Sequence, residues 1–189
     1  SVRPVYRAPR FPDVGSTPIP RYDLIKTRHY VTMAAQFTRG CPYDCEFCDI
    51  TKLNGRVPRT KSPEQMIAEF DLLYRLRWRG SLFVVDDNFI GNKRDAMRLL
   101  PEIQAWQKER GFPFSLYTEA SVNLVEIPDM LDAMSDAGFN MVFLGIESPN
   151  EAALLATKKK QNTAKSEDSE SYLLRAVRKI QEKGLVTSV

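Results

Sequence analysis

Long hydrophobic runs are the first thing that this sequence lacks. No stretch reaches the roughly 18 uncharged apolar residues that a membrane-spanning helix needs, so no transmembrane segment is predicted. Ser1–Arg10 contains prolines and arginines but no apolar centre, so we expect no secretory signal peptide. These two absences lead us to expect a cytoplasmic protein.

An excess of charge of one sign is also missing. The 27 Lys and Arg residues nearly balance the 24 Asp and Glu residues, which leaves a net charge of +3. So small a surplus does not indicate nucleic-acid binding, and we expect no nucleic-acid partner. With 43% hydrophobic and 27% charged residues over 189 positions, the composition suits about one globular domain and excludes a disordered tail or a collagen repeat.

Cysteine is scarce, and its placement is informative. The chain has three cysteines, Cys41, Cys45 and Cys48, and an odd number cannot pair off completely in disulfides. The C-x3-C-x2-C spacing fits iron–sulfur ligation, in which three thiolates hold a [4Fe–4S] cluster and leave one iron open for a substrate or cofactor. Two alternatives remain: a zinc site completed by His29 or Asp49, neither at the usual zinc-finger spacing, and buried free thiols.

Strand-like and helix-like segments alternate from Tyr30 onward. Apolar and alternating runs predict strands over residues 30–37, 81–85, 112–118, 140–146 and 185–189. Apolar residues at helical spacing predict helices that begin near residues 63, 92, 128, 150 and 171, and Ser62 followed by Gln65 predicts a capped start for the first. The runs 81–85 and 140–146 are apolar throughout and are expected to be buried on both faces. Pro101 is expected to kink or split the helix over 92–110.

This alternation is typical of an α/β fold with a parallel sheet, either doubly wound or closed as a (β/α) barrel. In both folds, ligands bind at the carboxyl ends of the strands. Polar clusters follow four of the predicted strands, over residues 39–48, 86–88, 118–123 and 147–148. The sequence therefore predicts a single site along this edge of the sheet.

The cysteine motif follows a first strand and carries Phe47 before its last cysteine, and in this it resembles the radical S-adenosylmethionine (SAM) superfamily. Further stretches are similar to the cobalamin (B12)-dependent members of that superfamily and, within them, to the hopanoid methylases. These stretches are Phe37–Pro42, Asp49–Ile50, Arg59–Gln65, Val85–Lys93 and Thr118–Ser121. The resemblance extends over about residues 16–189.

The resemblance implies a partial (β/α) TIM-like barrel of the radical SAM type over residues 30–189. A full eight-stranded barrel needs about 250 residues, so we expect this one to be incomplete at its C-terminal end, truncated in the fifth strand. Residues 1–29 hold five prolines and show no hydrophobic period. They are expected to be a linker from a preceding cobalamin-binding domain.

The resemblance also implies an activity. A radical SAM core binds a [4Fe–4S] cluster and reductively cleaves S-adenosylmethionine to methionine and a 5′-deoxyadenosyl radical. With cobalamin, the expected reaction is methylation of an unreactive carbon of a small-molecule or lipid substrate, with electrons from a reductant such as ferredoxin or flavodoxin. The alternatives are a radical SAM enzyme of another type, such as methylthiolation or ring rearrangement, and a non-enzymatic zinc-stabilised binding module.

Individual roles are implied position by position. Cys41, Cys45 and Cys48 match the cluster ligands, and Phe47 matches a position near the adenine of SAM. The segment Asp86–Asn88 stands where the family has a Gly-Gly-Glu motif for the amino group of SAM, although the glycines are absent here. Asp86, Asp87 and Asn88 are the residues expected to make this contact. The other expected SAM contacts are Glu119 for the ribose hydroxyls, Ser121 for the carboxylate, and Glu147 and Ser148 for the ribose.

Two further groups of charged residues are predicted to face solvent. Arg56, Arg59 and Lys61 are interpreted as solvated charges, with a contact to another domain as the alternative, and Lys158–Lys160 as an ordinary charged loop. Gln161 and Asn162, which follow that run, are considered for a place at the mouth of the barrel.

Overall fold

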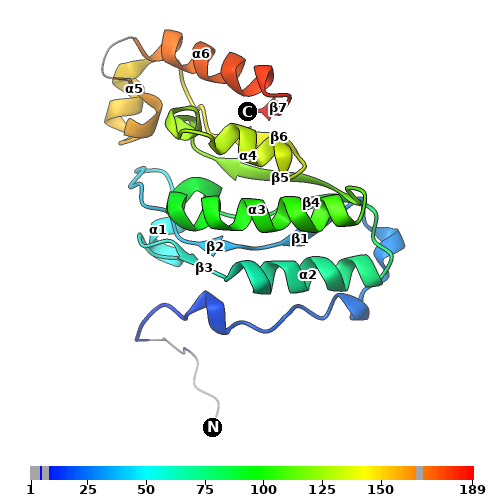
Figure 1. Ribbon diagram of the computed structural model, residues 1–189. Coiled ribbons are helices and arrows are strands. Elements are labelled where there is room, and N and C mark those ends of the chain that lie inside the picture. Colours follow the sequence, from blue (N-terminus) through cyan, green and yellow to red (C-terminus); the bar gives the residue numbers. More distant parts are fainter. Residues whose placement is uncertain (1–4, 6–8, 165–167) are drawn as a thin grey trace.

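The computed structural model describes residue 5, residues 9–164 and residues 168–189 of the chain. Its main sheet has five parallel strands in the order β1-β4-β5-β6-β7 (Figure 1). The strands are β1 (Thr32–Ala35), β4 (Gly80–Val84), β5 (Phe114–Ala120), β6 (Phe139–Leu144) and β7 (Val186–Ser188). A small antiparallel ribbon joins β2 (Thr38–Arg39) to β3 (Arg59–Thr60).

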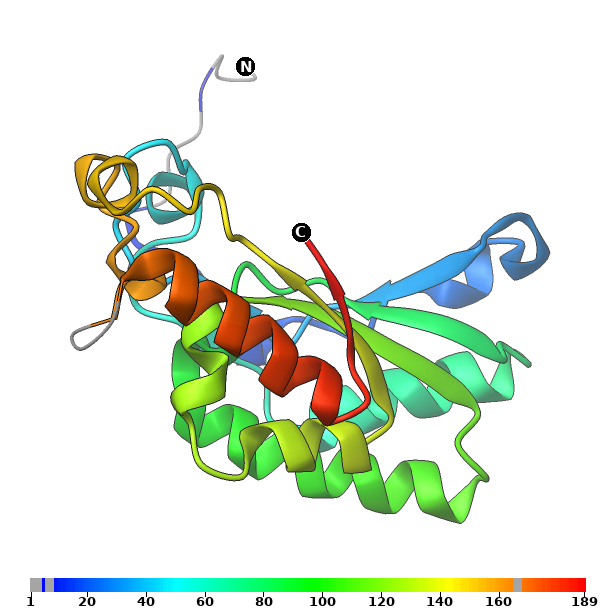
Figure 2. The ribbon, with the colours of Figure 1, turned by 90° about the horizontal axis from the view of Figure 1, so that it is seen from above.

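Helices separate the strands along the chain. They are α1 (Ile50–Leu53), α2 (Pro63–Arg75), α3 (Lys93–Glu109), α4 (Met130–Asp136), α5 (Glu151–Ala156) and α6 (Ser169–Glu182). Of these, α2, α3, α4 and α6 cover one face of the sheet (Figure 2). Consecutive parallel strands that lie side by side, each followed by a helix, are the wall of a (β/α) barrel. The predicted fold class, a partial barrel of parallel strands, is confirmed.

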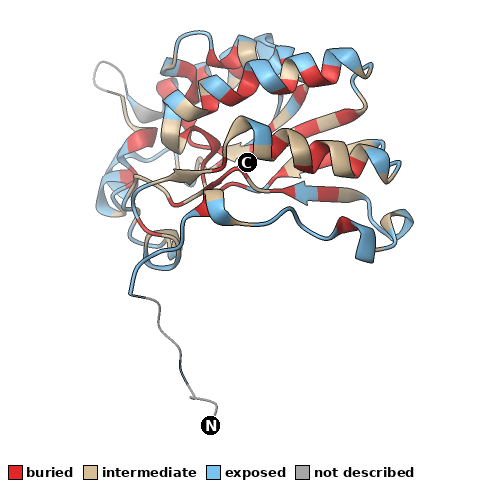
Figure 3. Cartoon of the chain, turned by 60° about the horizontal axis from the view of Figure 1, so that its bottom comes forward, coloured by how far each residue is buried: buried red, intermediate tan, exposed pale blue. Residues whose placement is uncertain are grey.

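Burial of the strands differs from the prediction. Buried segments alternate with less buried ones along the strands (Figure 3). Leu82 and Val84 are buried, whereas Phe83 between them is only partly buried. In β6 the same alternation leaves Phe143 43% exposed beside buried Val142. Successive side chains of a strand point to opposite faces. The expectation of burial on both faces is therefore wrong for the described residues, since the helices cover one face of the sheet only.

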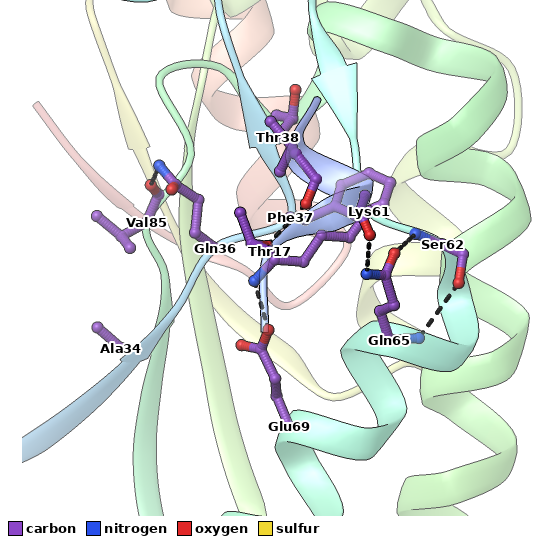
Figure 4. Close-up of polar contacts among 12 residues, drawn as sticks. Thr17, Ala34, Gln36, Phe37, Thr38, Lys61, Ser62, Gln65, Glu69 and Val85 are labelled. Atoms are coloured by element: carbon purple, nitrogen blue, oxygen red, sulfur yellow. Dashed lines mark hydrogen bonds and ion pairs between the residues drawn. The ribbon is translucent and has the colours of Figure 1, made fainter. Parts of the chain in front are cut away.

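The start of α2 follows the prediction closely. The Ser62 hydroxyl accepts a hydrogen bond from the Gln65 amide, and the Gln65 side chain accepts one from the Ser62 amide (Figure 4). This reciprocal pair satisfies two donors that would otherwise lack partners at the helix start. Gln65 also donates to the carbonyl oxygen of Gly15, which fastens part of the N-terminal segment to the helix.

Pro101 lies within α3, which continues without a break from Lys93 to Glu109. Of the two predicted effects, the split is therefore wrong, and the kink stays a prediction. A proline removes one backbone hydrogen bond and crowds the preceding turn. Buried Leu99, Leu100 and Ile103 hold this helix against the sheet, and their burial outweighs the local loss.

Two side chains that the sequence placed at the surface or in a linker are buried. Tyr22, within residues 1–29, donates its hydroxyl to the carbonyl oxygen of Ala34 at 2.7 Å. Lys61, predicted to be solvated, forms a buried ion pair with Glu69 of α2 (Figure 4). An adjacent carboxylate from another element makes this burial possible, and local sequence does not reveal such a partner. Residues 1–4 and 6–8 of the expected linker lie outside the described residues.

Among the described residues, no helix is both long enough and apolar enough to cross a membrane.

Candidate functional site

A cavity of about 200 Å³ lies where the carboxyl ends of β4, β5 and β6 face the loop between β2 and α1. All three cysteines line it. The other lining residues are Tyr43, Phe47, Asp87, Asn88, Glu119, Ala120, Ser121, Phe143, Gly145, Glu147, Lys159 and Gln161. The sequence predicted a single site along this edge of the sheet, and the structure brings most of the proposed residues together there.

The cysteine loop enters the site through Gly40. This residue has a φ of +103°, and a Cβ atom there would lie 2.9 Å from the carbonyl oxygen of Gly55. Glycine is therefore the residue that fits both the backbone conformation and the close approach. The Cys41 amide then donates to the same Gly55 oxygen at 3.2 Å, which closes the base of the loop.

Adjacent carboxylates after β4 have different environments. Asp86 is buried and accepts hydrogen bonds from the amides of Phe37 and Thr38 at 2.8 and 2.9 Å. Its burial raises the pKa of the carboxyl to about 7. Asp87 lines the cavity and accepts from the Gly40 amide at 2.9 Å. Asp86 therefore holds the junction of β1 and β2. The sequence analysis expected this residue to contact S-adenosylmethionine, but it does not line the cavity.

Asn88 and Ser121 connect the ends of β4 and β5. The Asn88 side-chain amide donates to the Ser121 hydroxyl at 3.0 Å and lies 3.9 Å from the Cys41 sulfur. The Ser121 hydroxyl in turn donates to Asn123, whose side-chain amide donates to the Tyr43 hydroxyl. Tyr43, inside the cysteine motif, thus lines the site although the sequence analysis assigned it no role. This chain of hydrogen bonds fixes the cysteine loop relative to both strands.

Two glutamates reach the cavity from β5 and the end of β6. Burial is the larger cause that raises the pKa of Glu119 above its ordinary value, and the neighbouring negative charge of Asp87 is the smaller one. Glu147 has a φ of +64° and accepts a hydrogen bond from the Lys159 ammonium at 2.9 Å. A non-glycine residue in this region is strained, and such strain is concentrated at functional sites.

Lys159 corrects the prediction of an ordinary charged loop. It is only 8% exposed, lines the cavity, and places its ammonium 5.5 Å from the centre of the Phe47 ring. Gln161 donates to the Cys45 sulfur at 3.3 Å, in agreement with its suggested place at the mouth. Ser148 does not line the cavity, because its hydroxyl accepts from the Asn150 amide in the turn before α5. The run of three lysines contains no pattern that marks the middle one as buried.

The cysteines suit a cluster better than a single ion. Among the described residues, no three His, Cys, Asp or Glu side chains come close enough together to hold one metal ion. A tetrahedral zinc site needs four such ligands around one centre. In a cluster each thiolate binds its own iron, and side-chain amides commonly donate hydrogen bonds to the sulfurs. Two amides, from Asn88 and Gln161, lie next to Cys41 and Cys45 in this way. Burial also raises the pKa of the Cys41 thiol.

Comparison with known proteins places this chain in a family. Residues 35–189 match the radical SAM superfamily. The chain belongs to the radical SAM superfamily. Its cavity at the strand ends, with the cysteine loop on one side, is the candidate functional site of this radical SAM chain.

Relatives within the superfamily are named as methyltransferases. An uncharacterized methyltransferase of Synechocystis is 53% identical over 91% of this chain and 32% of its own length. The hopanoid C-2 methylase of Rhodopseudomonas palustris is 46% identical over 79% of this chain and 28% of its own length. This chain thus spans about a third of the length of these relatives. Among solved structures, the cobalamin-dependent radical SAM enzyme OxsB superposes with a TM-score of 0.74 at 19% identity, over 94% of this chain and 26% of OxsB.

Proposed function

We propose that this radical SAM chain is the core of a cobalamin-dependent methyltransferase that methylates an unreactive carbon. The observation that supports it best is the convergence of three cysteines and three strand ends on one cavity. Cys41, Cys45 and Cys48 would hold a [4Fe–4S] cluster. The chemistry that such a cluster supplies when bound is one-electron reductive cleavage of S-adenosylmethionine. The names of the relatives, which include methyltransferases and a hopanoid methylase, support methyl transfer as its use.

The residues of the chain would bind and orient S-adenosylmethionine against the cysteine loop. Asp87 and Glu119 place carboxylates on the cavity wall, where they attract the amino group and the sulfonium of SAM. The Ser121 hydroxyl and the Asn88 amide provide polar groups within the same wall. Glu147, whose carboxylate is oriented by Lys159, suits the ribose hydroxyls.

Phe47 and Phe143 contribute the apolar part of the cavity. Both side chains are about half exposed and line it. An aromatic ring beside a planar base stacks on its face, so Phe47 suits the adenine of SAM. Together with Ala120, these rings would give the cavity an apolar surface against which the adenine could pack.

Cobalamin would be bound largely by parts of the protein outside this chain. This proposal rests on the relatives, of whose length the chain spans about a third, and on the cobalamin dependence of OxsB. A small molecule or a lipid is the proposed substrate, and a ferredoxin or flavodoxin is the proposed electron donor.

The test is anaerobic reconstitution with iron and sulfide, followed by reduction in the presence of S-adenosylmethionine. We expect a brown protein with about four iron atoms per chain that forms 5′-deoxyadenosine and methionine. Cys41→Ala, Cys45→Ala and Cys48→Ala should each abolish product formation. The matched control is Ser135→Ala on the exposed side of α4, which should leave it unchanged.

A colourless protein that binds one zinc ion and leaves S-adenosylmethionine intact would contradict the proposal. It would favour the zinc-stabilised binding module instead. Addition of methylcobalamin and candidate substrates to the active protein then distinguishes methyl transfer from other radical SAM reactions, since only methyl transfer yields a methylated product.

A further inference from the structure

The segment Thr157–Asn162, here called the strap, lies along the cysteine loop (Figure 2). The carbonyl oxygen of Thr157 accepts a hydrogen bond from the Glu46 amide at 2.9 Å. The Lys158 ammonium is 3.3 Å from the Glu46 carboxylate. Lys159 stands beside the Phe47 ring, and Gln161 contacts the Cys45 sulfur. Four residues of the strap thus contact Cys45, Glu46 and Phe47 of the loop, more than 100 positions away in the sequence.

The other side of the strap is attached to the end of β6. The Asn162 side-chain amide is fully buried and donates to the carbonyl oxygens of Gly145 and Ile146, each at 2.8 Å. Lys159 adds its bond to Glu147. A side chain at Gly145 would collide with Lys159, because a Cβ atom there would lie 2.6 Å from its ammonium nitrogen. The strap therefore links the last strand of the site to the cysteine loop.

Gln161 is the member of the strap that touches a sulfur. It is 8% exposed, and its amide nitrogen lies 3.3 Å from the Cys45 sulfur. Its side-chain oxygen is buried without a hydrogen-bond partner in the described part of the chain. Burying an amide costs free energy unless its polar atoms are bonded. The contact with sulfur is thus the interaction that holds this side chain in the wall of the cavity.

We propose that the strap is a positioning element for the cysteine loop, and that Gln161 raises the reduction potential of the cluster through its hydrogen bond to Cys45. The inference rests on the proposed function, because it assumes a cluster on the three cysteines. Reduction adds negative charge that the sulfurs share. A donor aimed at a sulfur stabilises the reduced form more than the oxidised form, which shifts the potential upward.

The experiment compares Gln161→Leu with Gln104→Leu, the same substitution on α3 away from the cavity. In the reconstituted proteins, a redox titration followed by electron paramagnetic resonance should give a more negative midpoint potential for Gln161→Leu and an unchanged one for Gln104→Leu. In the cluster-free proteins, hydrogen exchange at the Glu46 amide should be about two- to tenfold faster in Gln161→Leu alone, as expected for the loss of one hydrogen bond.

An unchanged potential and unchanged exchange in Gln161→Leu would overturn the inference. If this variant does not fold, Gln161→Glu keeps the length of the side chain and replaces the donor by a carboxylate. Its potential should fall further than that of Gln161→Leu, and a potential at or above the wild-type value would overturn the inference. A wild-type protein that assembles no cluster would contradict the proposed function instead. The exchange measurement on that protein would then still decide whether the strap positions the loop.

Discussion

At the residue scale, Asp86 shows how a carboxylate beside a site can serve the fold. Its burial raises the pKa to about 7, from an ordinary value near 4. Between about pH 4 and about pH 7, Asp86 keeps its proton in the folded protein but has released it in the unfolded chain. Folding stability therefore decreases as the pH rises from about 4 to about 7, and this contribution is constant at higher pH.

Asp86→Asn should remove this dependence. Its amide oxygen can still accept from Phe37 and Thr38, and it carries no charge at any pH. Urea denaturation between about pH 4 and 7 should show wild-type stability falling by about 2–4 kcal/mol relative to the variant. Asp136→Asn, on the exposed side of α4, is the control and should follow the wild-type curve. Parallel curves for wild type and Asp86→Asn would contradict this account.

Gly138 makes a second prediction at this scale. Its φ is +89°, and a Cβ atom would lie 2.7 Å from the side-chain nitrogen of buried Gln107, which is bonded to Phe114. Gly138→Ala adds backbone strain and displaces Gln107, which breaks its hydrogen bond to Phe114. We therefore expect a loss of about 2–4 kcal/mol in unfolding free energy. Gly111→Ala carries strain at a φ of +69° but meets no atom within 4 Å. It should cost about 1–2 kcal/mol. Both losses are measured by thermal denaturation. Equal losses of stability in Gly138→Ala and Gly111→Ala would show that the contact with Gln107 adds nothing to the cost at Gly138.

At the scale of the element, the start of α2 could be predicted from four consecutive residues, Ser62–Gln65. Serine, proline, glutamate and glutamine in succession specify a capped helix by local chemistry, and the structure confirms the cap. Strand positions were predictable in the same way, with ends displaced by about two residues. The burial of Lys61 and Lys159 was not, because each depends on a carboxylate, Glu69 or Glu147, that only the folded structure places beside it. Asp86 and Asp87 are neighbours of the same chemistry, and only the tertiary structure separates their roles.

The cap of α2 gives the prediction at this scale. Ser62→Ala removes the acceptor of the Gln65 amide and should lower the unfolding free energy by about 1 kcal/mol. Ser135→Ala makes the same substitution at an exposed position within α4 and should stay within about 0.5 kcal/mol of wild type. Both values come from urea denaturation. A Ser62→Ala variant as stable as Ser135→Ala would show that the cap contributes nothing.

At the scale of the whole molecule, one face of the sheet carries the helices and the other carries aromatic side chains. Phe83 and Tyr117 stack there, with ring centres 4.7 Å apart, on strands whose alternate residues are buried under the helices. In a (β/α) barrel this face points to the interior. The aromatic face is therefore the inner side of the sheet, and the cavity lies at the carboxyl ends of its strands.

The cysteine spacing carried most of the information about function in the sequence, because three thiolates in eight residues leave few chemical uses. The wall opposite the loop was less accessible to prediction. Lys159 and the end of β6 come together through the strap, and Asn123 after β5 is bonded to Tyr43 of the loop; no local pattern encodes these contacts.

The central claim is that the cysteines hold a cluster with one iron open to S-adenosylmethionine. Electron paramagnetic resonance of the reduced, reconstituted protein, recorded with and without S-adenosylmethionine, tests this most directly. Binding at an open iron changes the electronic environment of the cluster, so we predict a changed signal when S-adenosylmethionine is added. An identical signal at saturating S-adenosylmethionine, from a protein that also forms no 5′-deoxyadenosine, would contradict the account.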